Sequence, residues 1–191
     1  MTQRFQDALT YAVQLHADQL RKGTTIPYVA HLLSVAAIVM EHGATEDEAI
    51  AALLHDAIED QGGDAARQEI RRRFGDSVVA IVDGCTDAEV VPKPPWRQRK
   101  EKYIAHLKDA PASVLLVSAA DKLHNARAVL GDYRVVGEEI WSRFKGGKDG
   151  TLWYYRAMLN ALLEHPLANR RLVEELGRVV IEMESLAGRK A

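Results

Sequence analysis

Apolar residues recur along the chain at the three- and four-residue spacing of an α-helix. The first such face comprises Phe5, Ala8, Leu9, Ala12, Val13, His16 and Leu20. The same spacing predicts further helices over residues 31–42, 45–60, 64–74, 76–82, 96–108, 112–130, 138–144, 151–164 and 167–187. The pattern therefore predicts an all-α fold of about ten helices, arranged as one domain over residues 1–191.

Two short runs rich in β-branched residues, 78–82 and 114–117, compete with that prediction. Each lies within a longer helical pattern, so we expect both to be buried helix rather than strand. Gly and Pro residues interrupt the periodicity over 22–27, where we expect a break. Loops are predicted over the proline-containing segment 85–95 and over the glycine-rich segment 146–150.

Polar residues mark where several helices begin. Thr45 and Glu48 have the spacing of a capping box, in which each side chain binds a free backbone amide of the first helical turn. Asp64 and Asp76 are predicted to cap the two helices that follow.

Charge argues against a nucleic-acid partner. The 191 residues include 25 Lys and Arg and 27 Asp and Glu, a net charge of −2, which gives no overall positive field. The one dense basic run, 71–73, is typical of a solvated helix face. A membrane partner is not expected either, because no apolar run approaches the ~18 residues of a membrane-spanning helix.

The chain has a single cysteine, Cys85, so it cannot form an internal disulfide, which is typical of a reducing compartment. The N-terminal segment lacks the basic start and the continuous apolar stretch of a signal peptide. We therefore predict a cytoplasmic protein. Cys85 follows an apolar stretch and is interpreted as a small buried residue rather than a nucleophile.

Four ionisable residues gather at the end of the predicted third helix, directly after the apolar run 49–54. On a continuous helix, residues four apart are neighbours, so His55 would face Glu59 and Asp56 would face Asp60. Burying such a cluster without partners costs several kcal/mol, and a bound cation removes that cost. For any one of these residues alone, a solvated acidic helix end is the simpler interpretation.

Two further residues fit the same chemistry. His31 opens the predicted second helix, and Asp121 lies at the centre of an otherwise apolar helix, where a carboxylate needs a partner. Asn125 lies four residues later, on the same face. Two imidazoles and two carboxylates form a mixed nitrogen and oxygen set suited to Mn²⁺, Zn²⁺ or Fe²⁺.

The order His, His-Asp, Asp resembles the HD-domain superfamily of metal-dependent phosphohydrolases, and four longer segments narrow the match. They read HADQLRKGTTIPYVAHLLSVA, AALLHDAIED, FGDSVVAIVDGCTD and SAADKLHNAR. Together they resemble the hydrolase domain of RelA/SpoT-type enzymes, in order and at compatible spacing, over about residues 5–130. Those enzymes remove the 3′-pyrophosphate of the alarmone ppGpp. The resemblance implies a compact HD-domain helical bundle and a stand-alone small alarmone hydrolase.

This resemblance implies one metal ion per chain. Its ligands would be His31, His55, Asp56 and Asp121, and the ion would be Mn²⁺, with Zn²⁺, Fe²⁺ and Co²⁺ also compatible. Many members of the family have proline after the first of these histidines, where this chain has Leu32, a difference expected to affect only the start of the helix.

The resemblance also implies catalytic and substrate-binding residues. Glu59 and Asp60 match a Glu-Asp pair that orients and activates the attacking water. Arg21 and Lys22 match a pair that packs on the nucleotide base and binds nearby polar groups. Asn125 matches a residue that contacts the nucleotide sugar.

Beyond Gly131 the match to the long enzymes fades, and residues 141–159 instead resemble a segment of small bacterial hydrolases. Lys145, Lys148 and Tyr155 are candidate phosphate-binding residues there, together with Tyr154 and Arg156. An ordinary amphipathic helix with solvated lysines is the alternative.

Two other functions remain as alternatives. One is an HD-superfamily nucleotidase or phosphatase acting on another nucleotide, and the other is a non-catalytic nucleotide sensor. The Glu-Asp pair combined with the Arg-Lys pair favours alarmone hydrolysis, and the presence of all six predicted metal and catalytic residues disfavours a sensor. Guanine and adenine alarmones stay equally open, as does a homo-oligomer. His16 and His124 fit either the site or a structural role.

Overall fold

The computed structural model describes residues 1–88 and 92–188, and within them it is all-α, as predicted. The only β-type pairing in these residues is an isolated bridge between Leu20 and Pro27. The elements are α1 (Gln3–Leu15), α2 (Val29–Glu41), α3 (Glu46–Leu54), α4 (Ala57–Gln61), α5 (Gly63–Phe74), α6 (Asp76–Cys85), α7 (Trp96–His106), η1 (Leu107–Asp109), α8 (Ala112–Val136), η2 (Gly137–Arg143), α9 (Gly147–Glu164) and α10 (Arg170–Gly188).

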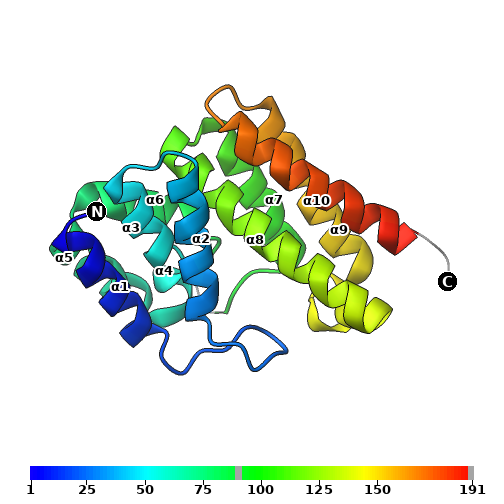
Figure 1. Cartoon of the computed structure of the whole chain (residues 1–191), viewed down its shortest axis with the longest axis horizontal. Coiled ribbons are helices and arrows are strands. Elements are labelled where there is room, and N and C mark those ends of the chain that lie inside the picture. Colours follow the sequence, from blue (N-terminus) through cyan, green and yellow to red (C-terminus); the bar gives the residue numbers. More distant parts are fainter. Residues whose placement is uncertain (89–91, 189–191) are drawn as a thin grey trace.

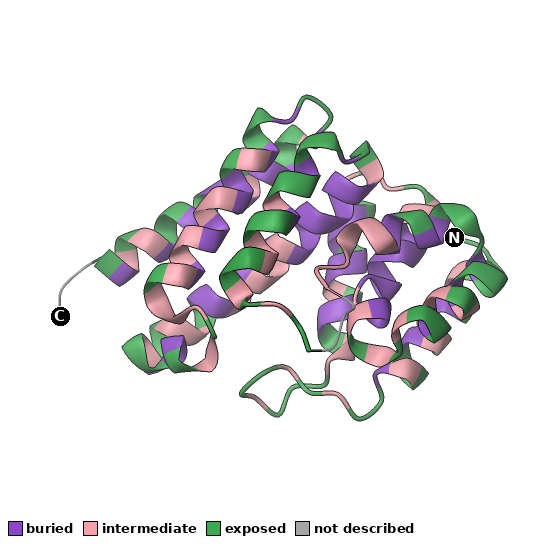
Figure 2. Cartoon of the chain, turned by 180° about the vertical axis from the view of Figure 1, so that it is seen from behind, coloured by how far each residue is buried: buried purple, intermediate pink, exposed green. Residues whose placement is uncertain are grey.

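Two helices form the interior of the molecule. Helix α3 packs against α1, α2 and α6, and all six residues of its apolar run 49–54 are fully buried. Helix α8 lies between this group and the C-terminal helices, contacting α2 and α6 on one side and α9 and α10 on the other (Figure 1). Buried residues are concentrated on these central helices, whereas the outer helices bury one face each (Figure 2).

Helix boundaries follow the predicted signals in most places. Thr45 and Glu48 form the predicted capping box, with both reciprocal bonds present. The runs 78–82 and 114–117 are buried helix, as predicted, within α6 and α8. The predicted loop 85–95 is replaced by helix at its first residue, and its residues 89–91 lie outside those described.

Two predicted caps are wrong. Asp64 and Asp76 lie inside the first turns of α5 and α6, and glycines Gly62 and Gly75 occupy the cap positions. Both glycines have a positive φ, 145° and 91°, a backbone conformation that an aspartate adopts only at a steric cost. The first helix also ends earlier than predicted, at Leu15, and Leu20 is half exposed in the following segment.

The glycine-rich segment 146–150 is not the predicted loop: residues 147–150 form the first turn of α9, and Gly146 is its cap. Its glycines accommodate a tryptophan from α7. A Cβ atom on Gly146 would approach the Trp96 ring to 2.7 Å, and one on Gly150 would approach it to 3.2 Å. The glycines therefore allow close packing between α7 and α9 rather than a turn.

None of the described helices is long and apolar enough to cross a membrane.

Candidate functional site

The predicted helix over 45–60 is interrupted at its most polar point. Helix α3 ends at Leu54, and α4 begins at Ala57, so His55 and Asp56 form the junction. The expected contact of His55 with Glu59 is wrong, because the two side chains have separate partners. Asp56 and Asp60 remain one turn apart, as predicted, and the Asp60 amide donates to the Asp56 carbonyl at 3.0 Å. At this junction each side chain faces a residue from another helix: His55 faces Asp121, and Asp56 faces His31.

Four predicted metal ligands meet at this junction. The Nε2 atom of His31, from α2, lies 3.2 Å from Asp121 Oδ1 and 3.6 Å from Asp56 Oδ2. The Nε2 atom of His55 lies 3.1 Å from Asp56 Oδ2 and 3.7 Å from Asp121 Oδ1. Three of these residues, His31, His55 and Asp56, offer donor atoms that all lie within 4.8 Å of one another. The fourth, Asp121, approaches both imidazoles from α8.

These distances fit a metal ion. Ligand atoms that lie about 2.0–2.2 Å from one ion are separated from each other by roughly 3–4 Å. His31 and His55 are 1 % and 3 % exposed, and the Nε2 atom of each is buried without a hydrogen-bond partner. The Nδ1 atom of His55 is bound to the Ala52 carbonyl at 2.8 Å, so it carries the proton and leaves Nε2 free as a ligand.

The charges of the cluster are strongly coupled. Burial disfavours a charge on His55, but Asp56 and Asp121 outweigh that effect and raise its pKa well above the usual value. Burial acts the other way on the two carboxyls, yet their cationic neighbours hold both pKa values well below the usual range. The carboxylates are therefore ionised, as metal ligands must be.

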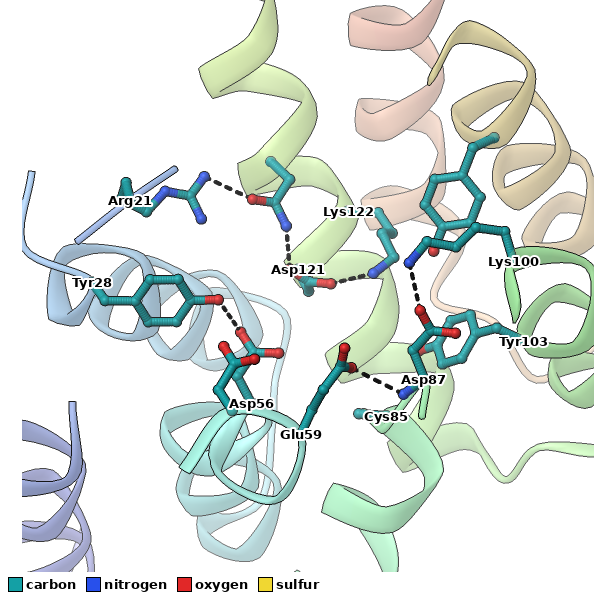
Figure 3. A pocket seen from close by; sticks show the side chains of 13 residues that line it. Arg21, Tyr28, Asp56, Glu59, Cys85, Asp87, Lys100, Tyr103, Asp121 and Lys122 are labelled. Atoms are coloured by element: carbon teal, nitrogen blue, oxygen red, sulfur yellow. Dashed lines mark hydrogen bonds and ion pairs between the residues drawn. The ribbon is translucent and has the colours of Figure 1, made fainter. Parts of the chain in front are cut away.

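Neighbouring side chains hold the carboxylates in place. The Tyr28 hydroxyl donates to Asp56 Oδ2 at 2.6 Å. On the other side, Asp121 accepts from the Lys122 ammonium through Oδ2 and from the Asn125 amide through Oδ1. Figure 3 shows these contacts converging from opposite walls of one pocket.

The two predicted catalytic carboxylates, Glu59 and Asp60, lie on α4 and line the same pocket of about 210 Å³. Glu59 accepts from the Lys93 ammonium at 2.8 Å and from the Asp87 amide at 3.2 Å. Asp60 accepts from the Gln19 side chain at 2.9 Å. Burial, and then the nearby Asp56 carboxylate, raise the pKa of Asp60, which makes it a better proton acceptor.

A series of hydrogen bonds links the predicted metal ligand Asp121 to the predicted substrate-binding residues Arg21 and Asn125. The Arg21 guanidinium donates to Asn125 Oδ1 at 2.7 Å, and the Asn125 amide donates in turn to Asp121. Arg21 also lies over the Tyr28 ring, 5.9 Å from its centre. Arg21 belongs to the segment between α1 and α2, so these hydrogen bonds join that segment to α8 (Figure 3).

A larger cavity of about 550 Å³ adjoins this pocket, and the two share the lining residues Arg21, Tyr28, Glu59, Lys100, Lys122, Asn125 and Tyr154. Its lining contains two carboxylates, from Glu59 and Asp132. Its basic lining residues are Arg21, Lys22, Lys93, Arg99, Lys100, Lys122, Arg143 and Lys145. We call this cavity the basic groove.

The basic groove contains most of the predicted substrate-binding residues. Lys22, Lys145 and Tyr155 line it together with Arg21 and Asn125. Lys148 does not line it, and its ammonium instead binds the Glu138 carboxylate at 2.8 and 3.0 Å. The structure therefore gives no support for a role of Lys148 in substrate binding.

Sequence reasoning missed several groups at the pocket. Lys100 binds Asp87 Oδ2 at 2.8 Å, and its ammonium lies 4.8 Å from the centre of the Tyr154 ring. Lys122 lies over Tyr103, 5.3 Å from the ring centre. Lys122 directly follows the predicted ligand Asp121, so its position in the sequence could have identified it as a site residue. Lys100 sits in a basic helix, and nothing in the sequence distinguishes it from its neighbours.

The remaining candidates have structural partners. Burial raises the pKa of the Cys85 thiol to about 11, which favours the prediction that it is not a nucleophile. His16 is buried, stacks on Tyr28 with ring centres 5.4 Å apart, and binds Gln19. The His124 Nδ1 atom lies 2.7 Å from His31 Nδ1, so it contacts a predicted metal ligand rather than the basic groove.

The arrangement combines two kinds of chemistry. Buried imidazoles and carboxylates form a site for a divalent cation, with two further carboxylates beside it. A groove rich in lysine and arginine leads into that site and suits a ligand with several negative charges. Together these features suit the hydrolysis of a polyanionic ester.

Comparisons with known proteins agree with this chemistry. Residues 8–152 match the model of a protein family described as HD domain. The MESH1 protein of Xenopus tropicalis, a guanosine-3′,5′-bis(diphosphate) 3′-pyrophosphohydrolase, is 36% identical over 139 residues, which cover 71% of this chain and 73% of that protein. The protein of the same enzymatic name from Aquifex aeolicus is 34% identical over 128 residues, 66% of this chain and 18% of that protein.

A solved structure extends the likeness to the fold. A metazoan ortholog of SpoT that hydrolyses ppGpp superimposes with a TM-score of 0.78, at 26% sequence identity, over 95% of this chain and 96% of that one. This chain therefore has about the extent of that protein, whereas it corresponds to less than a fifth of the Aquifex aeolicus protein.

Proposed function

Because this chain belongs to the HD-domain family, we propose that it removes the 3′-pyrophosphate of a guanosine or adenosine alarmone in a metal-dependent hydrolysis. One observation carries the proposal: a buried His-Asp cluster suited to a divalent cation opens directly into a groove lined by eight lysine and arginine side chains. The names and activities of its relatives, MESH1 and the SpoT ortholog, support the same reaction.

We propose that His31, His55, Asp56 and Asp121 hold one Mn²⁺ ion per chain. The donor set is rich in carboxylates, and it is also compatible with Zn²⁺, Fe²⁺ or Co²⁺. When bound, such an ion makes an attacking water more acidic and accepts negative charge from the phosphoryl oxygens.

The protein's own residues account for the other steps. Asp60, with its raised pKa, accepts a proton from the attacking water, and Glu59 orients that water from the same helix. The water oxygen forms a bond to the phosphorus next to the sugar, and the bond from that phosphorus to the 3′ oxygen breaks. The 3′ oxygen takes a proton, and from ppGpp or ppApp the products are pyrophosphate and the nucleoside 5′-diphosphate.

The basic groove would bind the substrate. Its ammonium and guanidinium groups neutralise phosphate charge, and Lys100 and Lys122 lie at the end of the groove nearest the predicted metal ligands. Arg21 and Lys22 would hold the base, and Asn125 the sugar. Lys145 and Tyr155 are the further candidates within the groove.

Three other features stay predictions of the sequence. They are a single domain over residues 1–191, a cytoplasmic location and a homo-oligomer.

Product analysis tests the proposal directly. The purified protein should be incubated with Mn²⁺ and, in parallel, with ppGpp, ppApp, GTP and ATP, and pyrophosphate and orthophosphate should be measured separately. We expect pyrophosphate from one or both alarmones and none from the ordinary nucleotides. The Asp121→Asn variant is the matched control for contaminating activity. Orthophosphate from several nucleotides would instead indicate a nucleotidase, and binding without turnover would indicate a sensor.

A further inference from the structure

Two histidines on different helices share a hydrogen bond beside the predicted metal site. The Nδ1 atom of His31, on α2, lies 2.7 Å from the Nδ1 atom of His124, on α8. The ring centres are 4.8 Å apart with an angle of 42° between the planes. At this separation the two nitrogens are joined by one proton, so one ring donates and the other accepts.

The surroundings of His31 determine which of the two rings donates the shared proton when a metal ion is bound. Its other nitrogen, Nε2, is buried without a hydrogen-bond partner and faces Asp121 and Asp56 at 3.2 and 3.6 Å. A nitrogen that binds a metal carries no proton. The proton of a neutral His31 must then lie on Nδ1, and His124 must accept it.

The other predicted histidine ligand is held differently. His55 donates its Nδ1 proton to the Ala52 carbonyl at 2.8 Å. A carbonyl oxygen only accepts, so this contact admits a single tautomer of His55. An imidazole can donate or accept, so the tautomer of His31 depends on the state of His124.

We propose that His124 is a positioning residue for the metal site: its Nδ1 accepts the Nδ1 proton of His31 and so presents His31 Nε2 as a ligand. The proposal rests on the metal site of the proposed function. It also gives a role to the turn of α8 from Asp121 to Asn125. That turn then carries one ligand and the partner of a second ligand, which sits on α2.

Two substitutions of the same shape separate the hydrogen bond from packing. In His124→Asn, Oδ1 takes the position along the side chain that Nδ1 holds in histidine, and it can accept the same proton. In His124→Leu, a methyl group takes that position and cannot accept. His42→Leu is the control, because His42 binds the Ile38 carbonyl of its own helix and lines no part of the site.

The readout is the dissociation constant for Mn²⁺ alone, measured by calorimetry or by the electron paramagnetic resonance signal of free Mn²⁺. We expect His124→Leu to weaken binding by about 10–100-fold, the usual effect of losing such a partner. His124→Asn should recover most of that loss, and His42→Leu should bind like the wild type. Equal binding by His124→Leu and wild type, or equal losses in the Leu and Asn variants, would overturn the proposal. If wild type and His55→Ala bound Mn²⁺ equally, the metal site itself would be wrong, so the two failures are distinguishable.

A second measurement needs no variant. In the wild-type protein loaded with diamagnetic Zn²⁺, nitrogen-15 NMR of the histidine rings reports which ring nitrogen carries a proton. We expect a proton on His31 Nδ1 and none on His124 Nδ1. An unprotonated His31 Nδ1 in the loaded protein would overturn the proposal, even if the leucine variant failed to fold.

Discussion

The His-Asp cluster, formed by His31, His55, Asp56 and Asp121, lies beside the basic groove, but the two regions are built in opposite ways. His55 and Asp121 are buried at the interior helices α3 and α8, and His31 is buried on α2, which packs against both of them. The groove is lined largely by long basic side chains from connecting segments and outer helices. Several are well exposed, including Lys93, whose side chain is 36 % accessible.

The two regions also differ in how their charges are balanced. In the cluster, the buried Nε2 atoms of His31 and His55 have no hydrogen-bond partner, and both face the carboxylates of Asp56 and Asp121. In the groove, basic groups already have carboxylate partners: Lys93 binds Glu59, and Lys100 binds Asp87. The cluster is therefore suited to a divalent cation, whereas the groove must exchange internal partners for an anionic ligand.

We therefore expect the cluster to determine turnover and the groove to determine substrate binding. Changes in the cluster should abolish turnover, because buried groups cannot be replaced by water or by mobile side chains. Changes in the groove should weaken substrate binding in steps, one for each positive charge removed, because many basic groups share the task.

The largest effect is expected in the cluster. His55→Ala removes a buried donor atom, and Asp121→Asn removes the charge of a predicted ligand. Each variant should lose Mn²⁺ binding and, with it, detectable turnover, as measured by calorimetry and pyrophosphate release. Near-wild-type turnover in either variant would mean that the cluster is not the catalytic centre.

The next effect concerns the two carboxylates of α4. Glu59→Ala and Asp60→Ala should lower kcat by ~10²–10⁴-fold, the usual contribution of a general acid or base. Binding of Mn²⁺ should persist, because neither residue belongs to the predicted ligand set. The roles assigned to Glu59 and Asp60 would be wrong if the double variant kept full activity.

A smaller effect is expected where the groove begins. Arg21→Ala and Lys22→Ala should each raise KM by about tenfold, equivalent to ~1.4 kcal/mol of binding free energy, with a modest loss of kcat. Arg21 should be the more sensitive of the two, because it also binds Asn125. Steady-state kinetics with ppGpp and ppApp provide the test, and an unchanged KM in the double variant contradicts the assignment.

The smallest effect distinguishes two neighbouring lysines. Lys145 lines the groove, whereas Lys148 is bound to Glu138 away from it. Lys145→Ala should raise KM a few-fold, and Lys148→Ala should leave it unchanged, which makes each the control for the other. The reverse ranking in the same kinetic assay would show that the groove has been outlined incorrectly.

The sequence predicted the helical architecture well, because apolar spacing reports directly on helices that bury one face. It failed where tertiary contacts override local signals. The pattern over 45–60 reads as one helix, yet the chain turns at His55 and Asp56, where side chains face partners on α2 and α8. The glycines at 146–150 indicated a loop, because sequence gives no sign that Trp96 packs against them.

The candidate site shows the same division. Residues in short motifs, such as His55-Asp56 and Glu59-Asp60, could be selected from the sequence together with their expected partners. Lys100 and Tyr28 could not, because they reach the pocket only through the packing of separate helices. The hydrogen bond between His31 and His124 joins residues 93 positions apart and was equally invisible in the sequence.

We expect one metal ion to bind where the buried cluster meets the basic groove. Crystals of the protein soaked in Mn²⁺, with diffraction measured on both sides of the manganese absorption edge, test it most directly. We expect one strong anomalous peak per chain, within about 2.0–2.4 Å of donor atoms from His31, His55, Asp56 and Asp121. No peak at that junction, or a peak contacted by none of these four residues, would contradict it.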